Sequence, residues 1–185
     1  MGGSLGEDKR ARLKEKLFER AIKFGDFTLA SGKKSKYYIN GKMATLDSEG
    51  VNLVAEIMLD MLEGTDCDAV GGPTLGADPM VGAIIALAHN RGRKLTGFIV
   101  RKESKGHGTK SLIEGPLDEG MKTVIVEDVA TTGGSAIRAI NAVKDFGCEV
   151  VKVMVIVDRA EGAIENFKKI DMPYEAIFSK EELGL

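Results

Sequence analysis

The sequence predicts an α/β fold in which a central, mostly parallel sheet is flanked by helices. Along residues 68–159, apolar strand-like segments alternate with segments of helical period. The apolar segments are continuous runs, which is typical of strands buried on both faces of a parallel sheet. A chain of 185 residues is long enough for one domain with a sizeable core. We therefore expect a single domain over 1–185.

Two helices and a hairpin are expected before the sheet. Apolar residues recur at helical spacing through 7–24, which predicts an amphipathic helix. Residues 27–40, FTLASGKKSKYYIN, indicate two short extended segments around a Ser-Gly turn. A second helix should run to Leu62, with either Asp47 or Ser48 as its N-cap.

The expected elements of the sheet region follow in order. Strands are predicted at 68–72, 95–101, 123–129, 149–159 and 174–179, with helices at 80–92, 134–147 and the C-terminus. In open α/β sheets, ligands bind at the carboxyl ends of the strands. Functional residues are therefore expected at 71–79, 101–110, 127–136 and 158–159.

The loop VATTGGSA, residues 129–136, has the composition of a phosphate site and is called the anion loop below. Gly133 and Gly134 permit positive φ and a close approach of a ligand. Hydroxyl donors and the free N–H groups of a following helix would complete the site. No GxxxxGK[ST] or GxGxxG pattern is present, so neither a Walker A loop nor a dinucleotide fingerprint is indicated. The alternative is an ordinary strand-to-helix turn.

Glu127 and Asp128 stand directly before that loop. Carboxylates accept hydrogen bonds from hydroxyl groups, so a ribose diol could bind the acids while its 5′-phosphate binds the loop. The alternative is a pair of solvated acids. An apolar strand, paired acids and an anion loop in one segment favour a sugar-phosphate site.

Residues 101–116, RKESKGHGTKSLIEGP, are too polar and Gly-rich for a regular element. A solvated surface is the alternative for such a charge run. Here the positive charge adjoins the expected sugar-phosphate site. Lys105 could stabilise a leaving diphosphate, and His107 could donate a hydrogen bond or a proton.

Arg159 follows the strand at 149–159. Its planar guanidinium can pair with a carboxylate of a ligand. The alternative is an ion pair with Asp158 or Glu161.

Several separated segments resemble the orotate phosphoribosyltransferases, which are type I phosphoribosyltransferases. The resemblance extends over 24–162 and is carried by the acid-acid loop at 123–135, Arg-Lys-x-x-Lys-x-His-Gly at 101–108, the segment 27–40 and Asp-Arg-x-Glu-Gly at 158–162. It implies the type I phosphoribosyltransferase fold with a small N-terminal hood, formed mainly by about 1–45. It also implies transfer of ribose 5-phosphate from phosphoribosyl diphosphate (PRPP) to orotate, giving orotidine 5′-monophosphate and pyrophosphate, a step of pyrimidine (UMP) synthesis.

The same resemblance implies a role for each residue of these motifs. Lys105, His107 and Asp128 would be catalytic, and Thr131 and Arg159 would bind orotate. PRPP would be bound by Arg101, Lys102, Lys105, His107, Glu127, Asp128, Val129, Ala130, Thr131, Thr132, Gly133, Gly134 and Ser135. Mg²⁺ would be held mainly by PRPP and water, with no direct protein ligand. The protein would be a homodimer in which the 101–110 loop reaches the neighbouring subunit's site.

Two positions depart from the family pattern. Ala30 stands where many bacterial members have a lysine before the Ser-Gly of the hood. Residues 74–75 stand near another expected lysine, in the loop after the first strand of the sheet. Lys33 or Lys34, and backbone N–H groups around 75–76, are candidates for the missing contacts.

Composition limits the remaining functions. A formal net charge of -2 provides no global basic field for nucleic acid. No apolar stretch reaches bilayer length, and the N-terminus lacks a signal peptide's apolar core. Cys67 and Cys148 form no disulfide framework and are expected to be buried, inert thiols in a cytoplasmic protein. The rival interpretations are a transferase acting on a purine base and a PRPP-sensing regulator without catalytic activity.

Overall fold

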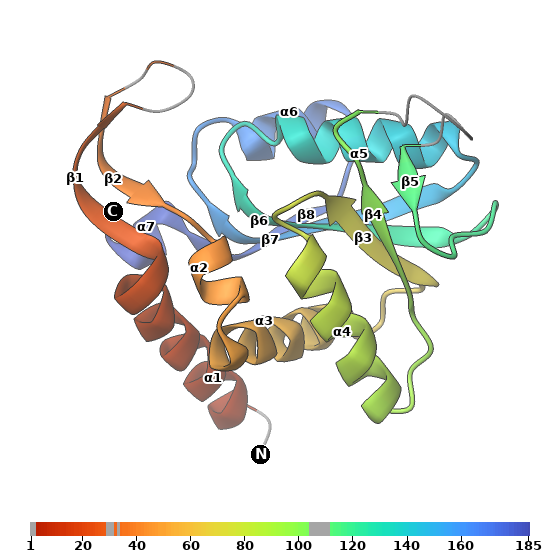
Figure 1. The fold of residues 1–185 in the computed structure, drawn as a ribbon, viewed down its shortest axis with the longest axis horizontal. Helices are drawn as coiled ribbons and strands as arrows, with labels where there is room; N and C mark the ends of the chain where they lie inside the picture. Colours follow the sequence, from red (N-terminus) through yellow and green to blue (C-terminus); the bar gives the residue numbers. More distant parts are fainter. Residues whose placement is uncertain (1–2, 29–31, 33, 104–111) are drawn as a thin grey trace.

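A six-stranded sheet forms the centre of the part of the chain that the computed structural model describes, residues 3–28, 32, 34–103 and 112–185 (Figure 1). The strand order is β5-β4-β3-β6-β7-β8, and every pair is parallel except β4–β5. The strands are β3 (Ala69–Pro73), β4 (Thr96–Val100), β5 (Ile113–Glu114), β6 (Lys122–Ala130), β7 (Glu149–Asp158) and β8 (Tyr174–Ser179). The predicted mostly parallel sheet is confirmed.

Helices cover both faces of the sheet (Figure 1). On one face lie α1 (Gly3–Lys16), α3 (Ser48–Met61) and α4 (Asp78–Asn90), and on the other lie α5 (Gly134–Asp145) and α6 (Ala163–Lys169). Of the two alternatives for the N-cap of α3, Asp47 is the cap, because its carboxylate accepts the Gly50 N–H at 3.0 Å.

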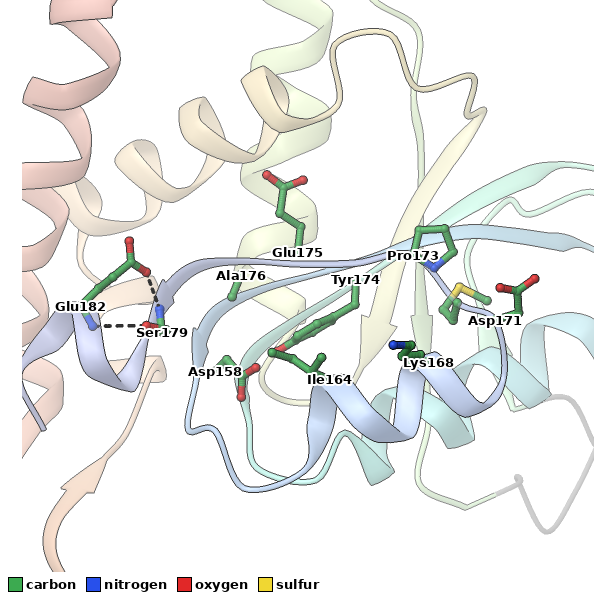
Figure 2. Close-up of a pocket in the computed structure, with 11 residues that line it drawn as sticks. Asp158, Ile164, Lys168, Asp171, Pro173, Tyr174, Glu175, Ala176, Ser179 and Glu182 are labelled. Atoms are coloured by element: carbon green, nitrogen blue, oxygen red, sulfur yellow. Dashed lines mark hydrogen bonds between the residues drawn. The ribbon is translucent and has the colours of Figure 1, made fainter.

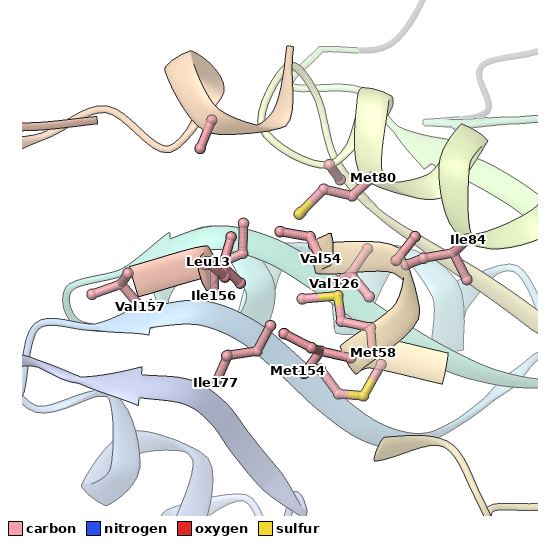
Figure 3. Close-up of a cluster of buried hydrophobic side chains, with 14 of the residues drawn as sticks. Leu13, Val54, Met58, Met80, Ile84, Val126, Met154, Ile156, Val157 and Ile177 are labelled. Atoms are coloured by element: carbon pink, nitrogen blue, oxygen red, sulfur yellow. The ribbon is translucent and has the colours of Figure 1, made fainter. Parts of the chain in front are cut away.

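Two hydrophobic cores, one on each side of the sheet, account for the continuous apolar runs. Along β6, Val124 and Val126 pack with α3 and α4, whereas Ile125 packs with α5. Along β7, Met154 and Ile156 belong to the first core, which Figure 3 shows in close-up. Each strand therefore buries side chains on both faces, as parallel strands between two helical layers must.

The N-terminal segment differs from the prediction. The helix expected over 7–24 is α1 followed by a π-helical turn, Leu17–Ala21, and strand β1 (Ile22–Thr28) begins there. Pairing with β2 (Lys34–Ile39) in an antiparallel ribbon replaces the last helical turn. In Figure 1 this ribbon extends beyond one end of the main sheet. The division of the chain into one domain with a hood stays a prediction.

Three short elements were not expected: α2 (Lys42–Thr45), β5 and α6. The predicted C-terminal helix is present as α7 (Lys180–Leu183). The segment 101–116 therefore does contain a regular element, since β5 pairs antiparallel with the end of β4. Its apolar Ile113 is buried, which accounts for the pairing.

The carboxyl ends of β3, β4, β6 and β7 meet at one edge of the sheet because these strands are mutually parallel. At that edge β3 approaches β6 closely: a Cβ on Gly72 would lie 2.0 Å from the Val126 carbonyl oxygen and 2.8 Å from Ala77 Cβ.

No helix in the described residues is long and apolar enough to cross a membrane.

We expect Gly72→Ala to lower the free energy of unfolding by about 1–3 kcal/mol, because the new methyl group meets backbone that has no room to move. Urea unfolding would measure the loss. Gly82→Ala in α4 is the matched control: nothing lies within 4 Å of its Cβ position. It should stabilise the helix by about 0.5–1 kcal/mol. Equal stability of Gly72→Ala and the wild type would contradict the close approach.

Candidate active site

A cavity of about 400 Å³ lies where the strand ends meet. Its lining comes from α2, the loop after β3, the end of β4, Leu112, the acids of β6 and α5 from Ser135 to Asp145. The segments 73–76, 100–102 and 127–128, far apart in the sequence, thus face a common space. The described residues of these segments that were predicted to form the site therefore lie together at this edge, and their chemical roles stay a prediction.

Asp128 is held at the floor of this cavity. Its carboxylate accepts the Val129 N–H at 3.0 Å, and its side chain is 13% exposed. A Cβ on Gly41 would lie 2.8 Å from Asp128 Oδ2, and a Cβ on Gly76 would lie 2.5 Å from Oδ1. Glycine at both positions lets two backbone segments approach the carboxylate from either side.

Glu127 is more deeply buried than Asp128. Its carboxylate accepts hydrogen bonds from the Ser135 side chain and the Ala136 N–H, at the start of α5. Burial, and next the charge of Asp128, raise the pKa of Glu127 to about 7. The two acids therefore have different surroundings. Asp128 is the more exposed of the two, and Glu127 is buried at the start of α5.

The anion loop is positioned by α6. Gly133 has φ 74°, and a Cβ there would lie 2.7 Å from the Phe167 ring. Asn166 Nδ2 donates a 3.0 Å hydrogen bond to the Thr132 carbonyl oxygen. These two contacts place the loop at the N-terminus of α5, where N–H groups and the helix dipole favour an anion.

The hydroxyl of Ser135 has hydrogen-bond partners within the chain. The Ser135 hydroxyl accepts a 3.1 Å hydrogen bond from Arg138 Nη2 and also contacts Glu127. It links the acid to the helix in this structure. A phosphate contact by Ser135, and by the other loop residues, stays a prediction.

Two residues of the basic segment lie in the described region. Arg101 and Lys102 both line the cavity. Arg101 Nη1 also pairs with Glu114 Oε1 of β5 at 3.2 Å. Lys105, His107 and Lys110 lie outside the described residues.

Arg159 lies beside the anion loop because its N–H donates to the Ala130 carbonyl oxygen at 2.9 Å. Its side chain is buried, with Nε 3.1 Å from Glu161 Oε1 and the guanidinium 5.0 Å above the Tyr37 ring of β2. Of the two ion-pair alternatives, the Glu161 pair is present. The Asp158 carboxylate instead accepts the Ala160 N–H at 2.8 Å.

The hairpin expected to cover the base is present as β1 and β2 around the residues that are not described. Phe27 and Tyr38 contact each other across it, with ring centroids 5.6 Å apart and ring planes tilted by 34°. Ser35 Oγ donates to the Tyr37 carbonyl oxygen at 2.6 Å. The position of Ala30, with Ser31 and Lys33 beside it, lies outside the described residues, so the replacement of that hood lysine stays open.

Several residues that shape the site were not identified from the sequence. They are Gly41, Lys42, Arg138, Asn166 and Phe167. None belongs to a recognisable motif, since each acts through contact with a distant segment. Gly76 was named only for its backbone N–H group, and the fold alone shows that Gly41 and Gly76 both approach Asp128.

A second cavity of about 540 Å³ lies at the edge strand β8, beside α6 (Figure 2). Its charged lining consists of Asp158, Asp171, Glu175 and Glu182 against the single Lys168. Reciprocal hydrogen bonds between Ser179 and Glu182 cap α7 at one end, as Figure 2 shows. The excess of carboxylates opposes binding of an anion, and none of the predicted substrate-binding residues lines this cavity.

No group of three or more His, Cys, Asp or Glu residues that could hold a metal ion is found in the described region. Cys67 and Cys148 are both free and buried, as expected, and burial raises the pKa of each thiol.

The comparisons with known proteins agree with this geometry. Residues 47–178 match the family model of the phosphoribosyl transferase domain. An orotate phosphoribosyltransferase of Streptomyces avermitilis is 43% identical over 180 residues, which cover 97% of this chain and 99% of the relative. That of Aquifex aeolicus is 42% identical over 182 residues, covering 97% and 98%.

Solved structures show the same similarity. The orotate phosphoribosyltransferase of Mycobacterium tuberculosis H37Rv, in complex with Fe(III) dicitrate, has a TM-score of 0.85 and 40% identity. The alignment covers 96% of this chain and 99% of that one. The same enzyme in complex with PRPP has a TM-score of 0.81, with 37% identity and the same coverage.

An acid pair and an anion loop at the carboxyl edge of this sheet, with a family match over most of the chain, define a phosphoribosyltransferase. Within that class, the chain belongs to the orotate phosphoribosyltransferase family.

The raised pKa of Glu127 predicts a pH-dependent stability. The folded-state pKa is about 7 and the ordinary value is 4.5, so the folded protein holds this proton more tightly. Glu127 therefore stabilises the fold below about pH 4.5, and that contribution is lost as the pH rises through about 7. Glu127→Gln, which does not ionise, should be more stable than the wild type at pH 8 by about 1–3 kcal/mol, with little difference near pH 4.5.

Urea unfolding at the two pH values would test this. Glu63→Gln, at an exposed position, is the control and should match the wild type at both. A Glu127→Gln variant less stable than the wild type at pH 8 would show that the ionised carboxylate stabilises the fold.

Proposed function

We propose that this protein transfers the ribose 5-phosphate group of PRPP to orotate, giving orotidine 5′-monophosphate and pyrophosphate. The observation that carries the proposal is the convergence of the acid pair, the anion loop and Arg159 at one edge of the sheet. The similarity to orotate phosphoribosyltransferases supports the choice of orotate.

The ribose 5-phosphate would bind across β6 and α5. Glu127 and Asp128 would accept hydrogen bonds from the ribose hydroxyls, and the loop from Val129 to Ser135 would surround the 5′-phosphate. The N-terminus of α5 offers N–H donors and a favourable dipole to that phosphate. The contacts of Asn166 and Phe167 with the loop would hold these donors in place before the substrate arrives.

The diphosphate would bind the basic side of the cavity. Arg101 and Lys102 line it, and Lys105 and His107 would act from the segment that follows. A cation close to the departing diphosphate stabilises the charge that develops in the transition state. We propose that this loop acts in the active site of the partner subunit of a homodimer.

Orotate would bind between the anion loop and the hood. Arg159 Nε contacts Glu161, and no described residue accepts a hydrogen bond from its terminal Nη atoms. That end of the guanidinium would pair with the orotate carboxylate, with Thr131 beside it. Tyr37, stacked on the guanidinium, would keep its plane fixed.

Mg²⁺ is the cofactor that we propose. Glu127 and Asp128 line the cavity, and their carboxylate oxygens can accept hydrogen bonds from metal-bound water, so the lining fits a Mg–PRPP complex without a direct protein ligand. PRPP and water would supply most of its ligands. When bound, the ion would neutralise negative charge on the diphosphate.

In the reaction, the bond between ribose C1 and the diphosphate oxygen would break, and a bond from orotate N1 to C1 would form on the opposite face. The N1 proton is released to water, and both electrons of the broken bond leave with pyrophosphate. Exclusion of water would protect the oxocarbenium-like centre from hydrolysis. No covalent enzyme intermediate is required.

We also propose that the protein is cytoplasmic and that residues 1–185 form a single domain with a small N-terminal hood.

Base selectivity tests the function directly. With PRPP and Mg²⁺, we expect the enzyme to consume orotate, followed by its absorbance, and to leave adenine, hypoxanthine and uracil unchanged. Turnover of a purine instead would keep the ribose phosphate site and reject the assignment of Arg159. PRPP binding without turnover of any base would favour a regulator.

Loss of the loop cation and loss of the acid should both impair catalysis. Lys105→Ala, His107→Ala and Asp128→Asn should each lower turnover by roughly 10²-fold, the scale of losing one charge-stabilising or acid–base group. Unchanged turnover in any variant would remove that residue from the mechanism.

Mixing variants tests the shared loop. If the loop serves the partner's site, a heterodimer of Lys105→Ala and Asp128→Asn subunits contains one intact site. An equal mixture that re-equilibrates should then recover about a quarter of the wild-type activity. If activity stayed at the level of the separate variants, the loop would act within its own subunit.

A further inference from the structure

We propose that Lys42, on the short helix α2 at the base of the hood, binds the diphosphate of PRPP. The inference rests on the proposed function, because it concerns the same cavity and substrate. It adds a residue from the N-terminal segment to a site otherwise built from the sheet edge.

The backbone places Lys42 at the acid pair. Gly41, directly before it, approaches Asp128 so closely that a Cβ would lie 2.6 Å from the Asp128 Cβ. The Lys42 ammonium then lies 3.7 Å from Asp128 Oδ2 and lines the cavity. The close contact of Gly41 with Asp128 thus fixes the backbone position of Lys42.

The chemistry of the ribose connects Lys42 to the diphosphate. In PRPP the diphosphate is attached to C1, next to the carbon that carries the 2-hydroxyl. A carboxylate that accepts a ribose hydroxyl therefore lies close to the diphosphate oxygens. An ammonium beside that carboxylate can reach those oxygens by rotation of its flexible stem.

The distribution of charged residues around the cavity also supports a role for Lys42. The backbone segment across from α2, Pro73 to Gly76, has no charged side chain. The described basic residues of the lining are Lys42, Arg101, Lys102 and Arg138, against Glu127, Asp128 and Asp145. Arg101 is paired with Glu114, and Arg138 is bonded to Ser135. Lys42 is the described cation placed directly beside Asp128.

A purely structural role for Lys42 is weakly supported. The side chain is 42% exposed, and 3.7 Å is longer than a hydrogen bond. Exposed ion pairs of this kind contribute about 0–1 kcal/mol to stability. The stability of the fold therefore gives little reason for a lysine at this position, whereas an anionic substrate does.

Calorimetric titration of the full-length protein tests the inference. Lys42→Gln should weaken binding of PRPP and of pyrophosphate, each with Mg²⁺, by roughly 10- to 100-fold, the scale of one charged hydrogen bond. Binding of ribose 5-phosphate should change by less than about 2-fold, because it lacks the diphosphate. Lys42→Arg, which keeps the charge, should retain most of the PRPP affinity.

Lys122→Gln is the matched control. Lys122 is 41% exposed and pairs with Asp66 at 2.6 Å, at the opposite end of β6. The Lys122→Gln variant should bind PRPP, pyrophosphate and ribose 5-phosphate like the wild type. Thermal unfolding should show that both glutamine variants are folded.

PRPP binding by Lys42→Gln within about 2-fold of the wild type would overturn the inference. So would an equal loss of ribose 5-phosphate binding, which would indicate an effect through Asp128, or a rise in KM confined to orotate. The titrations need no turnover. If the wild type bound PRPP but left orotate unchanged, the proposed function would fail while the result for Lys42 still held.

Discussion

Three backbone segments approach one another around the side chain of Asp128, and the arrangement of the site follows from that contact. Gly41 of the N-terminal segment and Gly76 after β3 lie on either side of the carboxylate, where a Cβ would meet it at 2.5–2.8 Å. Gly72 permits a similar approach between β3 and β6. The carboxyl ends of the strands, the hood and the acid pair are therefore joined by packing that tolerates no side chain at these positions.

The different surroundings of Glu127 and Asp128 limit the negative charge that the acid pair adds to the cavity. Two ionised carboxylates would repel each other and the phosphates of the substrate. Burial of Glu127 favours its neutral form near pH 7, which lowers the negative charge of the cavity. The hydrogen bonds from Ser135 and Ala136 oppose this effect and keep the ionised form accessible. Asp128 is more open than Glu127 and lies 3.7 Å from the Lys42 ammonium.

The N-terminal segment contributes to both ends of the site. Tyr37 of β2 stacks on Arg159, where the base is proposed to bind. Lys42 of α2 lies beside Asp128, where the diphosphate is proposed to bind. A displacement of this segment would therefore affect the two substrates together. On the other face of the sheet, helix α6 supports the anion loop. Asn166 donates a hydrogen bond to the Thr132 carbonyl oxygen, and the Phe167 ring lies against Gly133.

The sequence by itself determined the features that depend on neighbouring residues. Continuous apolar runs predict strands buried on both faces, and the run from Glu127 to Ser135 predicts an acid pair followed by an anion loop. The tertiary structure decided the rest. The pairing of Ile22 with Ile39 ended the first helix early, and the contact of Gly41 with Asp128 brought Lys42 into the site. Local periodicity contains no information on such contacts, because they join segments that are distant in the chain and meet only when the core packs.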